Sequence, residues 1–194
     1  MVSAEKIVWN KMLKGDEEAF SLVYQKYATP LYHFGLKFTA RQDIIEDCIQ
    51  DLFISFLKKN ARLGNGDNVQ YYLLKAFRNN LLRVLKREKI YTETSDRNYE
   101  FEATFSIEES IILNETIDQR KKALLKSLKA LSSRQKEAVY LRYTKGFEYK
   151  QVAGIMDMEV ESCRNLISRA INKLRKEINE ETDLILYFLF TSVK

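Results

Sequence analysis

Proline occurs once in these 194 residues, at Pro30, and glycine occurs only six times. Because both residues interrupt helices, a chain with so few of them can carry long helices with few breaks. Apolar residues recur at intervals of three and four through most of the sequence, whereas alternation with a period of two is scarce. Hydrophobic residues make up 45% of the chain, enough to build buried cores. We therefore predict an all-α protein.

In the first half of the chain, helix signals follow one another closely. A short amphipathic helix carries Trp9 as a packing anchor, and Asp16 is a good N-cap for the next helix. The pair Thr29-Pro30 predicts the start of a separate helix that ends near Phe38. Further helices are expected from about Asp43 and from about Val69 to Lys86. Between them, the glycine-rich stretch LGNGDN at residues 63–68 is the strongest loop signal in the sequence.

The second half begins with a polar segment and then returns to helical periodicity. Residues 88–106 lose the pattern and are interpreted as a flexible linker. A helix resumes near Ile107, and Ser132-Ser133-Arg134-Gln135 fits a capping box for a helix that runs to about Tyr143. A short helix from 148 to 156, a turn at 157–159 and a long helix to about 178 complete the pattern.

Charge divides the chain in the same way. The net charge is +5 over residues 1–87, −7 over 88–118 and +9 over 119–178. Two basic blocks separated by an acidic segment favour two small helical domains that bind a polyanion, although two bundles with solvated faces would give the same counts. We expect domains at 1–87 and 107–178, a linker at 88–106 and an apolar tail at 179–194.

Several classes of protein are disfavoured. Cys48 and Cys163 form no CxxC pair and His33 is the only histidine, so we expect no disulfide framework, metal site or cofactor.

The apolar run at residues 184–190 is too short to span a bilayer, and the N-terminus does not have the pattern of a signal peptide. We expect a cytoplasmic protein that does not insert into the membrane. An enzyme is disfavoured because no phosphate-binding glycine loop or nucleophile–base pair is evident.

The two helices joined at residues 157–159 predict a helix-turn-helix. Ala153, Met158, Cys163, Ile167 and Ala170 would form its packing face, and Asp157 would adopt the left-handed conformation of the turn. The second helix would then expose side chains that read base edges or grip phosphates. A helical hairpin with a solvated basic surface is the plain alternative.

Two more faces invite a functional interpretation. On the helix over 69–86, positions 71, 75, 78, 82 and 86 form one stripe, and a basic stripe that begins with an aromatic suits single-stranded nucleic acid. On the preceding helix, acidic side chains gather near apolar ones and suit a basic protein partner. Solvation, and the interaction of acidic groups with the helix dipole, would explain the same residues without any function.

Three segments resemble one family. Residues 47–59 (DCIQDLFISFLKK) and 72–79 (YLLKAFRN) resemble region 2 of bacterial sigma-70-family factors. Residues 131–143 (LSSRQKEAVYLRY), with the hairpin at 149–176, resemble region 4. The two-domain plan resembles the extracytoplasmic-function (ECF) group. The resemblance departs from the family at Tyr72, where Trp is usual, and at Asp157, Glu159 and Cys163.

This resemblance implies a promoter-specificity subunit of RNA polymerase that has no catalysis of its own. Its partners would be core RNA polymerase and promoter DNA, and many ECF factors are also held by an anti-sigma factor. The expected polymerase contacts are Glu46, Asp47, Gln50, Asp51 and Phe53. The expected contacts with the melted minus-10 element are Asn65, Gly66, Asp67, Asn68, Tyr71, Lys75, Arg78, Asn79, Arg83 and Lys86. The expected contacts with the duplex minus-35 element are Ser162, Arg164, Asn165, Ser168, Arg169 and Lys173.

One other function is compatible with the hairpin. A stand-alone helix-turn-helix regulator would bind duplex DNA and would not need the acidic helix at 46–57. The tail at residues 183–194 lies outside the resemblance, and we expect it to dock on this chain or on a regulator because its apolar run would otherwise be exposed.

Overall fold

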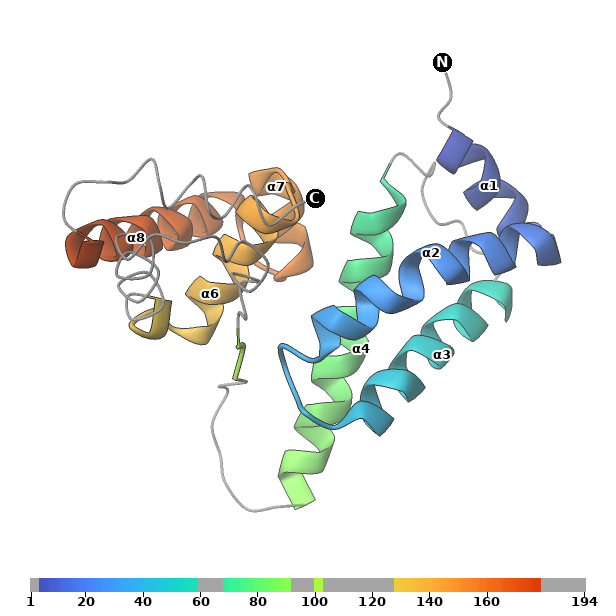
Figure 1. Ribbon diagram of the computed structural model, residues 1–194, viewed down its shortest axis with the longest axis horizontal. Coiled ribbons are helices and arrows are strands. Elements are labelled where there is room, and N and C mark those ends of the chain that lie inside the picture. Colours follow the sequence, from blue (N-terminus) through green and yellow to red (C-terminus); the bar gives the residue numbers. More distant parts are fainter. Residues whose placement is uncertain (1–3, 59–67, 92–99, 103–127, 179–194) are drawn as a thin grey trace, which may run out of the picture. The chain divides into compact units, whose positions relative to one another are not determined.

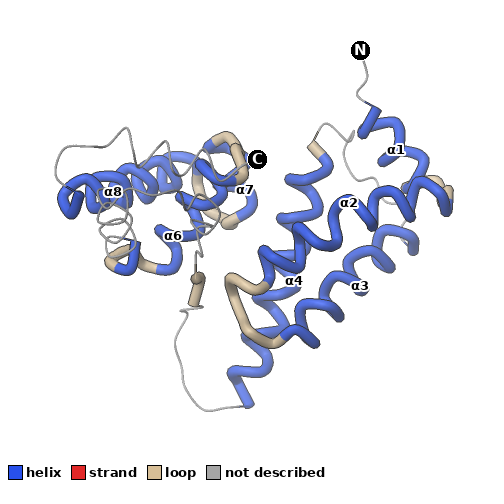
Figure 2. Tube along the Cα trace, viewed as in Figure 1, coloured by secondary structure: helices blue, strands red, loops and turns tan. Residues whose placement is uncertain are grey.

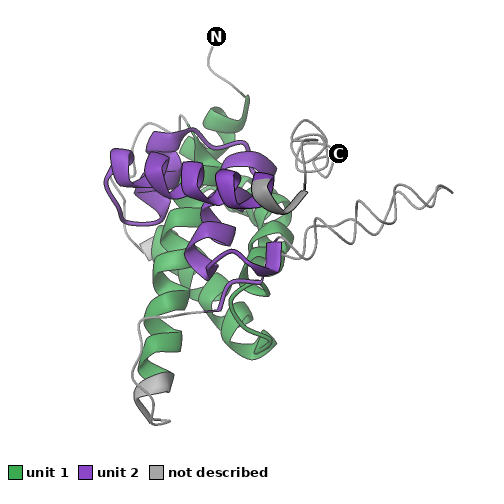
Figure 3. Ribbon diagram, turned by 90° about the vertical axis from the view of Figure 1, so that its left-hand side faces the viewer, with its two compact units in different colours: residues 1–99 green, residues 100–194 purple. Residues whose placement is uncertain are grey.

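A computed structural model describes residues 4–58, 68–91, 100–102 and 128–178 of the chain. Every regular element in these residues is a helix, which confirms the predicted all-α class (Figures 1 and 2). The chain divides into two compact units, residues 1–99 and residues 100–194 (Figure 3). The expected tail at 183–194 and the helix expected to begin near Ile107 fall mostly or wholly outside the described residues.

The described part of the first unit contains four helices, α1 (Ala4–Met12), α2 (Glu17–Gly35), α3 (Gln42–Lys58) and α4 (Val69–Tyr91). Helices α2, α3 and α4 pack against one another, and α1 packs mainly on α2 (Figure 1). Helix α4 continues about one turn beyond the predicted end near Lys86, into the segment expected to be a linker.

Asp16 caps α2 as predicted, because its Oδ1 accepts a hydrogen bond of 2.8 Å from the Ala19 N–H. The predicted break at Thr29-Pro30 is wrong, since α2 continues through Pro30 to Gly35. A proline inside a helix removes one backbone hydrogen bond. The helix continues because Val23, Tyr27, Leu31 and Phe34 form one buried stripe on both sides of the proline.

Aromatic side chains fill the core of the first unit. Trp9 is fully buried and meets the Phe56 ring edge-on at 5.6 Å, which confirms its predicted role as a packing anchor. Phe34 of α2 lies 6.4 Å from Phe77 of α4. Aromatic pairs of this kind contribute roughly 0.5–1.5 kcal/mol beyond the burial of their area. Because Phe56 of α3 and Phe77 of α4 are held in the core by these contacts, the opposite sides of the two helices face the solvent.

The second unit contains α6 (Ser133–Val139), a π-helical turn η1 (Tyr140–Thr144), α7 (Tyr149–Ile155) and α8 (Val160–Ile178). The capping box at Ser132 is confirmed: Gln135 N–H donates to Ser132 Oγ at 3.3 Å, and Ser132 N–H donates to Gln135 Oε1 at 3.0 Å. The π-helical turn was not predicted. This turn rotates the side chains of residues 140–144 relative to those of α6. The helix ends at Gly146, which adopts a left-handed conformation with φ of 72°.

The turn between α7 and α8 has the predicted chemistry. Asp157 adopts a left-handed conformation with φ of 51°, and the Met158 N–H donates to the Ala153 carbonyl at 3.0 Å. This six-to-one bond is the one that closes a Schellman motif. Ala153, Cys163, Ile167 and Ala170 are all buried as expected, whereas Met158 is only half-buried. Met156, two residues earlier, is buried.

The segment predicted as a linker supplies one residue to this core. Phe101 is only 1% exposed, and its ring centroid lies 5.8 Å from that of Tyr140 in η1. No helical or strand periodicity surrounds Phe101, so no local pattern predicts its burial. Phe101 therefore packs into the second unit, while its neighbours Glu100 and Glu102 are exposed.

Candidate functional site

Helix α8 has a sharply divided surface. Cys163, Ile167, Ala170 and Leu174 are each no more than 1% exposed and face the core of the unit. Because these positions are spaced by three and four residues, the opposite side of the helix is left to solvent. The six predicted minus-35 residues are all exposed: Ser162, Arg164, Asn165, Ser168, Arg169 and Lys173. The structure therefore places the six on the solvent side of a helix that follows a tight turn.

Two of these side chains also contact the second unit itself. Lys173 Nζ donates to the Ala130 carbonyl at 2.5 Å. The Arg164 guanidinium lies 5.2 Å from the ring centroid of Tyr149, the first residue of α7. Sequence reasoning missed Tyr149, because a contact between two different helices leaves no periodic signal in the sequence.

Helix α4 has a basic outer face that differs in part from the predicted stripe. Asn79, Arg83 and Lys86 are exposed, and Tyr71 and Lys75 are half-buried, with Lys75 Nζ 5.8 Å from the Tyr71 ring centroid. Asn68 caps the helix through a 2.9 Å bond from the Tyr71 N–H to its Oδ1. Asn65, Gly66 and Asp67 lie outside the described residues.

The expectation that Arg78 lies on the outer face of α4 is wrong, because this side chain is only 4% exposed. Counted from Leu74, the positions i+3, i+4 and i+7 are Phe77, Arg78 and Leu81. Arg78 therefore belongs to the same buried side of the helix as these three apolar residues. The predicted outer stripe was therefore wrong at Arg78, which lies on the buried side of α4. The exposed basic face is formed by Asn79, Arg83 and Lys86 with Lys75 at its margin.

Helix α3 exposes four of the five residues expected to bind polymerase: Glu46, Asp47, Gln50 and Asp51. The expectation that Phe53 is a surface contact is wrong, since Phe53 is 1% exposed. Its ring packs against Tyr24 at 5.0 Å and Phe20 at 5.9 Å, both from α2. Position 53 falls on the buried stripe with Ile49, Leu52 and Phe56. Ile54, which was not predicted, is 44% exposed beside the acidic residues.

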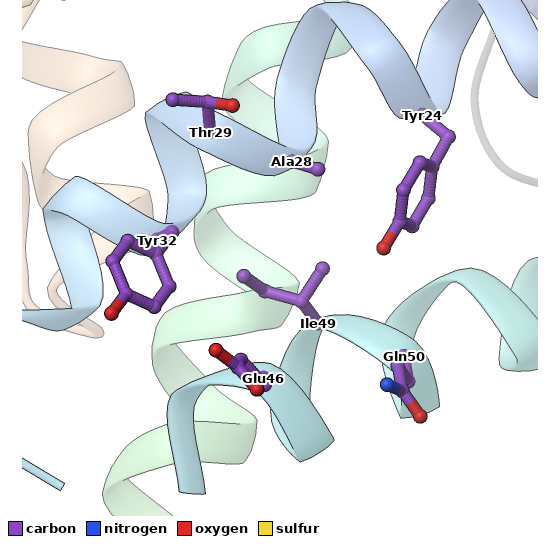
Figure 4. A pocket seen from close by; sticks show the side chains of 7 residues that line it. All are labelled: Tyr24, Ala28, Thr29, Tyr32, Glu46, Ile49 and Gln50. Carbon is purple, nitrogen blue, oxygen red and sulfur yellow. The ribbon is translucent and has the colours of Figure 1, made fainter. Parts of the chain in front are cut away.

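A pocket of about 330 Å³ opens between α2 and α3 next to this face (Figure 4). Tyr24 and Tyr32 of α2 flank it, Ile49 and Ala28 supply apolar surface, and Glu46 and Gln50 supply polar groups. Tyr24 is 37% exposed, although it also contacts the buried Phe53. We define the acidic face as Glu46, Asp47, Gln50 and Asp51, and it borders a pocket with two aromatic walls.

Other sites are not found within the described residues. No helix there is long and apolar enough to cross a bilayer, and no three His, Cys, Asp or Glu side chains are grouped as metal ligands. Cys48 and Cys163 are buried free thiols. Burial raises the pKa of the Cys48 thiol to about 11, and the neighbouring Asp51 and Asp47 add to this effect. A thiol with so high a pKa is a poor nucleophile near neutral pH.

Comparison with known families matches both units. Residues 23–90 match the model for sigma-70 region 2, and residues 121–174 match the model for sigma-70 region 4. The ECF RNA polymerase sigma-E factor of Salmonella typhimurium is 25% identical over 178 residues, covering 86% of this chain and 90% of that protein. The ECF RNA polymerase sigma factor SigM of Bacillus subtilis is 22% identical over 160 residues, covering 81% of this chain and 93% of that protein.

Two solved structures share the fold. CnrH, solved with the cytosolic domain of CnrY, aligns with a TM-score of 0.58 at 16% identity, over 92% of this chain and 99% of CnrH. The sigma factor RpoE of Bartonella quintana, solved with the anti-sigma factor NepR, aligns with a TM-score of 0.58 at 22% identity, over 84% of this chain and 98% of RpoE. A stand-alone helix-turn-helix regulator is not favoured, because region 2 and region 4 occur together in one chain. The chain belongs to the sigma-70 family, in its extracytoplasmic-function group.

Proposed function

We propose that this chain is a promoter-specificity subunit that binds core RNA polymerase, recognises two promoter elements and directs where transcription begins. It acts in the cytoplasm as a binding protein and leaves the chemistry to the polymerase. The observation that carries this proposal is the division of α8, with four apolar residues buried and all six predicted minus-35 residues exposed, inside the part of the chain that matches region 4.

For α8 we propose that the exposed side enters the major groove of the minus-35 duplex. The width of the major groove admits one α-helix, and arginine and asparagine can each make two hydrogen bonds to a base edge. Arg164 and Asn165 are therefore the base-reading candidates. Ser162, Ser168, Arg169 and Lys173 surround them and are suited to hold phosphates, which set the register of the helix on DNA.

For α4 we propose contact with the melted minus-10 strand. Lys75, Arg83 and Lys86 supply positive charge along the helix, and Tyr71 supplies a ring at its N-terminal end. Such a combination binds single strands, because cations follow the phosphates while rings stack on exposed bases. Asn68, Asn79 and the preceding residues 65–67 complete the proposed minus-10 surface, and Arg78 leaves it because it is buried.

For α3 we propose that the acidic face, together with Ile54, docks on a basic and partly apolar surface of core polymerase. The adjacent pocket offers tyrosine rings and the Glu46 carboxylate to one cationic side chain of that partner. Phe53 supports this face from within the core. RpoE, which shares the fold, was solved with the anti-sigma factor NepR, so we include an anti-sigma factor among the partners.

The two DNA-binding units are expected to act through one chain. When the first unit is bound, the second searches only the volume allowed by the connecting segment, and this raises its effective concentration on the neighbouring element. Opening the minus-10 element costs a few kcal/mol for one flipped base, which binding to a preformed surface can offset. Rigid helices such as α4 can provide that surface.

Matched variants test these assignments. Asp51→Lys should weaken binding of the full chain to core polymerase, because it reverses charge in the middle of the acidic face, whereas Glu18→Lys makes the same change outside it.

Arg164→Ala should reduce the difference in binding free energy between the preferred and other base pairs at one minus-35 position by about 1–3 kcal/mol. Arg134→Ala removes an equal charge from α6 and should not change selection. Equal effects of each variant and its control would contradict the proposed surfaces.

A further inference from the structure

The contact between Arg164 and Tyr149 is part of a larger cluster. The Tyr149 ring has a second guanidinium near it, that of Arg142, at 4.9 Å from the ring centroid. Arg142 Nη1 donates to the Phe147 carbonyl at 3.0 Å, while its buried Nε finds no hydrogen-bond acceptor among the described residues. The electron-rich face of the Tyr149 ring therefore helps to stabilise the positive charge of the Arg142 guanidinium.

The Tyr149 ring is held from several sides. It is half-buried at the first position of α7, next to Glu148, whose N–H is fixed by a 2.9 Å bond to Gln151 Oε1. Burial raises the pKa of the Tyr143 hydroxyl, and the neighbouring Tyr149 adds to this effect. Arg142 and Tyr143 are adjacent residues of the π-helical turn, which thus brings both toward the same ring. These contacts make Tyr149 a fixed platform.

Arg164, in contrast, is an exposed side chain on the outer side of α8. A free arginine samples many rotamers, and fixing them on binding DNA costs entropy. Among the described residues no carboxylate forms an ion pair with Arg164, so the ring of Tyr149 is the contact that restricts it. A cation over a ring face keeps its N–H groups available, whereas a carboxylate partner would occupy the N–H groups that must reach a base.

We infer that Tyr149 is a positioning residue for promoter selection: its ring holds the Arg164 guanidinium in place before DNA arrives, so that Arg164 discriminates among bases at lower entropic cost. This inference rests on the proposed role of α8 in reading duplex DNA. It adds a specificity-determining residue that lies on α7, outside the recognition helix. The aromatic ring carries this role, and the Tyr149 hydroxyl has no part in it.

The test uses the full chain with core polymerase and a set of promoters that vary one minus-35 base pair at a time. Tyr149→Leu should reduce discrimination about two- to fivefold at the base pair that Arg164→Ala also relaxes, as expected for the loss of an exposed cation–π contact. Tyr149→Phe keeps the ring and should discriminate like the wild type. Tyr149→Leu combined with Arg164→Ala should be no worse than Arg164→Ala alone.

Uniform weakening on all promoters by Tyr149→Leu, or additive effects in the double variant, would overturn the inference. NMR of the free protein provides a readout without DNA. The Arg164 Hε and side-chain methylene protons should be shifted by the ring current in the wild type and in Tyr149→Phe, and the shift should be lost in Tyr149→Leu. If the shift is absent from the wild type, the inference fails even when the variant folds poorly.

The two experiments separate the inference from the function on which it rests. If Arg164→Ala leaves selection unchanged, the proposed role of Arg164 is wrong, whatever the NMR result. If Arg164→Ala relaxes selection and Tyr149→Leu does not, the proposed function stands and the positioning role of Tyr149 is refuted.

Discussion

Gly35 lies where α2 approaches α3 and α4 closely in the first unit. It is the last residue of α2, and a Cβ atom at this position would lie 2.7 Å from Ile45 Cγ2, 3.0 Å from Ile45 Cγ1 and 3.1 Å from Phe77 Cζ. Ile45 belongs to α3 and Phe77 to α4, so one added methyl group would press on both helices. These are the helices that carry the acidic face and the basic face.

The substitution Gly35→Ala has two opposing effects. Alanine favours the helical conformation over glycine by up to about 1 kcal/mol, and by less at the last residue of a helix. Inserting a methyl group into a packed core costs typically about 1–3 kcal/mol. Ile45 is branched at Cβ and fully buried, so it has little freedom to move away. We therefore expect a net loss of roughly 1–2 kcal/mol in the free energy of unfolding of this unit.

The single tryptophan gives a direct assay. Trp9 is buried in the first unit, so its fluorescence in urea reports the unfolding of that unit within the full chain. The loss from Gly35→Ala should largely disappear in an Ile45→Ala background, because the two nearest atoms are then absent. Gly15→Ala is the control: nothing lies within 4 Å of its Cβ position, and its cost comes from a φ of 88°, independent of Ile45. A neutral Gly35→Ala, or an equal loss in both backgrounds, would refute the reasoning.

Two further predictions concern stability. Hydrogen bonds from Lys26 and Tyr27 hold the pKa of Glu5 below its ordinary value of 4.5, so the stabilisation from this contact is present above that value and is lost as pH falls through the lower folded pKa. Urea unfolding followed by Trp9 should therefore lose stability in that window, and Glu5→Gln should flatten the change; an equal acid response in both proteins would contradict the role of Glu5. Phe101→Ala should destabilise the second unit by about 3 kcal/mol, as large buried aromatics do, while the exposed Glu102→Ala should not. Hydrogen exchange in α6 and α8 measures this, and unchanged protection in Phe101→Ala would contradict the packing of Phe101.

Much of the fold could be predicted because local rules and tertiary packing agree. The caps at Asp16 and Ser132 and the left-handed Asp157 are short-range features, and each was confirmed. The outer side of α8 was also correctly assigned, because its apolar residues are regularly spaced and so define which side of the helix is buried. Where residues of one kind gather on one side of a helix, periodicity predicts exposure well.

The errors lie where a residue stands at the edge of a buried arc or depends on distant partners. Arg78 was assigned to an outer stripe of basic residues, and Phe53 was expected to contact polymerase only because of the family resemblance. Both fall within three or four residues of buried apolar positions. Pro30 does not end α2, because tertiary packing on both sides outweighs one missing hydrogen bond. Phe101 and Tyr149 acquire their contacts from other elements of the second unit, and no local pattern in the sequence records such contacts.

The central claim is that this chain redirects a polymerase to its own promoters. Transcription from a genomic library by core RNA polymerase, with and without the purified full chain, tests that claim most directly. We predict new start sites that share two spaced elements and that are lost with Asp51→Lys. If the start sites are the same with and without the chain, and the chain does not associate with core polymerase, the proposed function is contradicted.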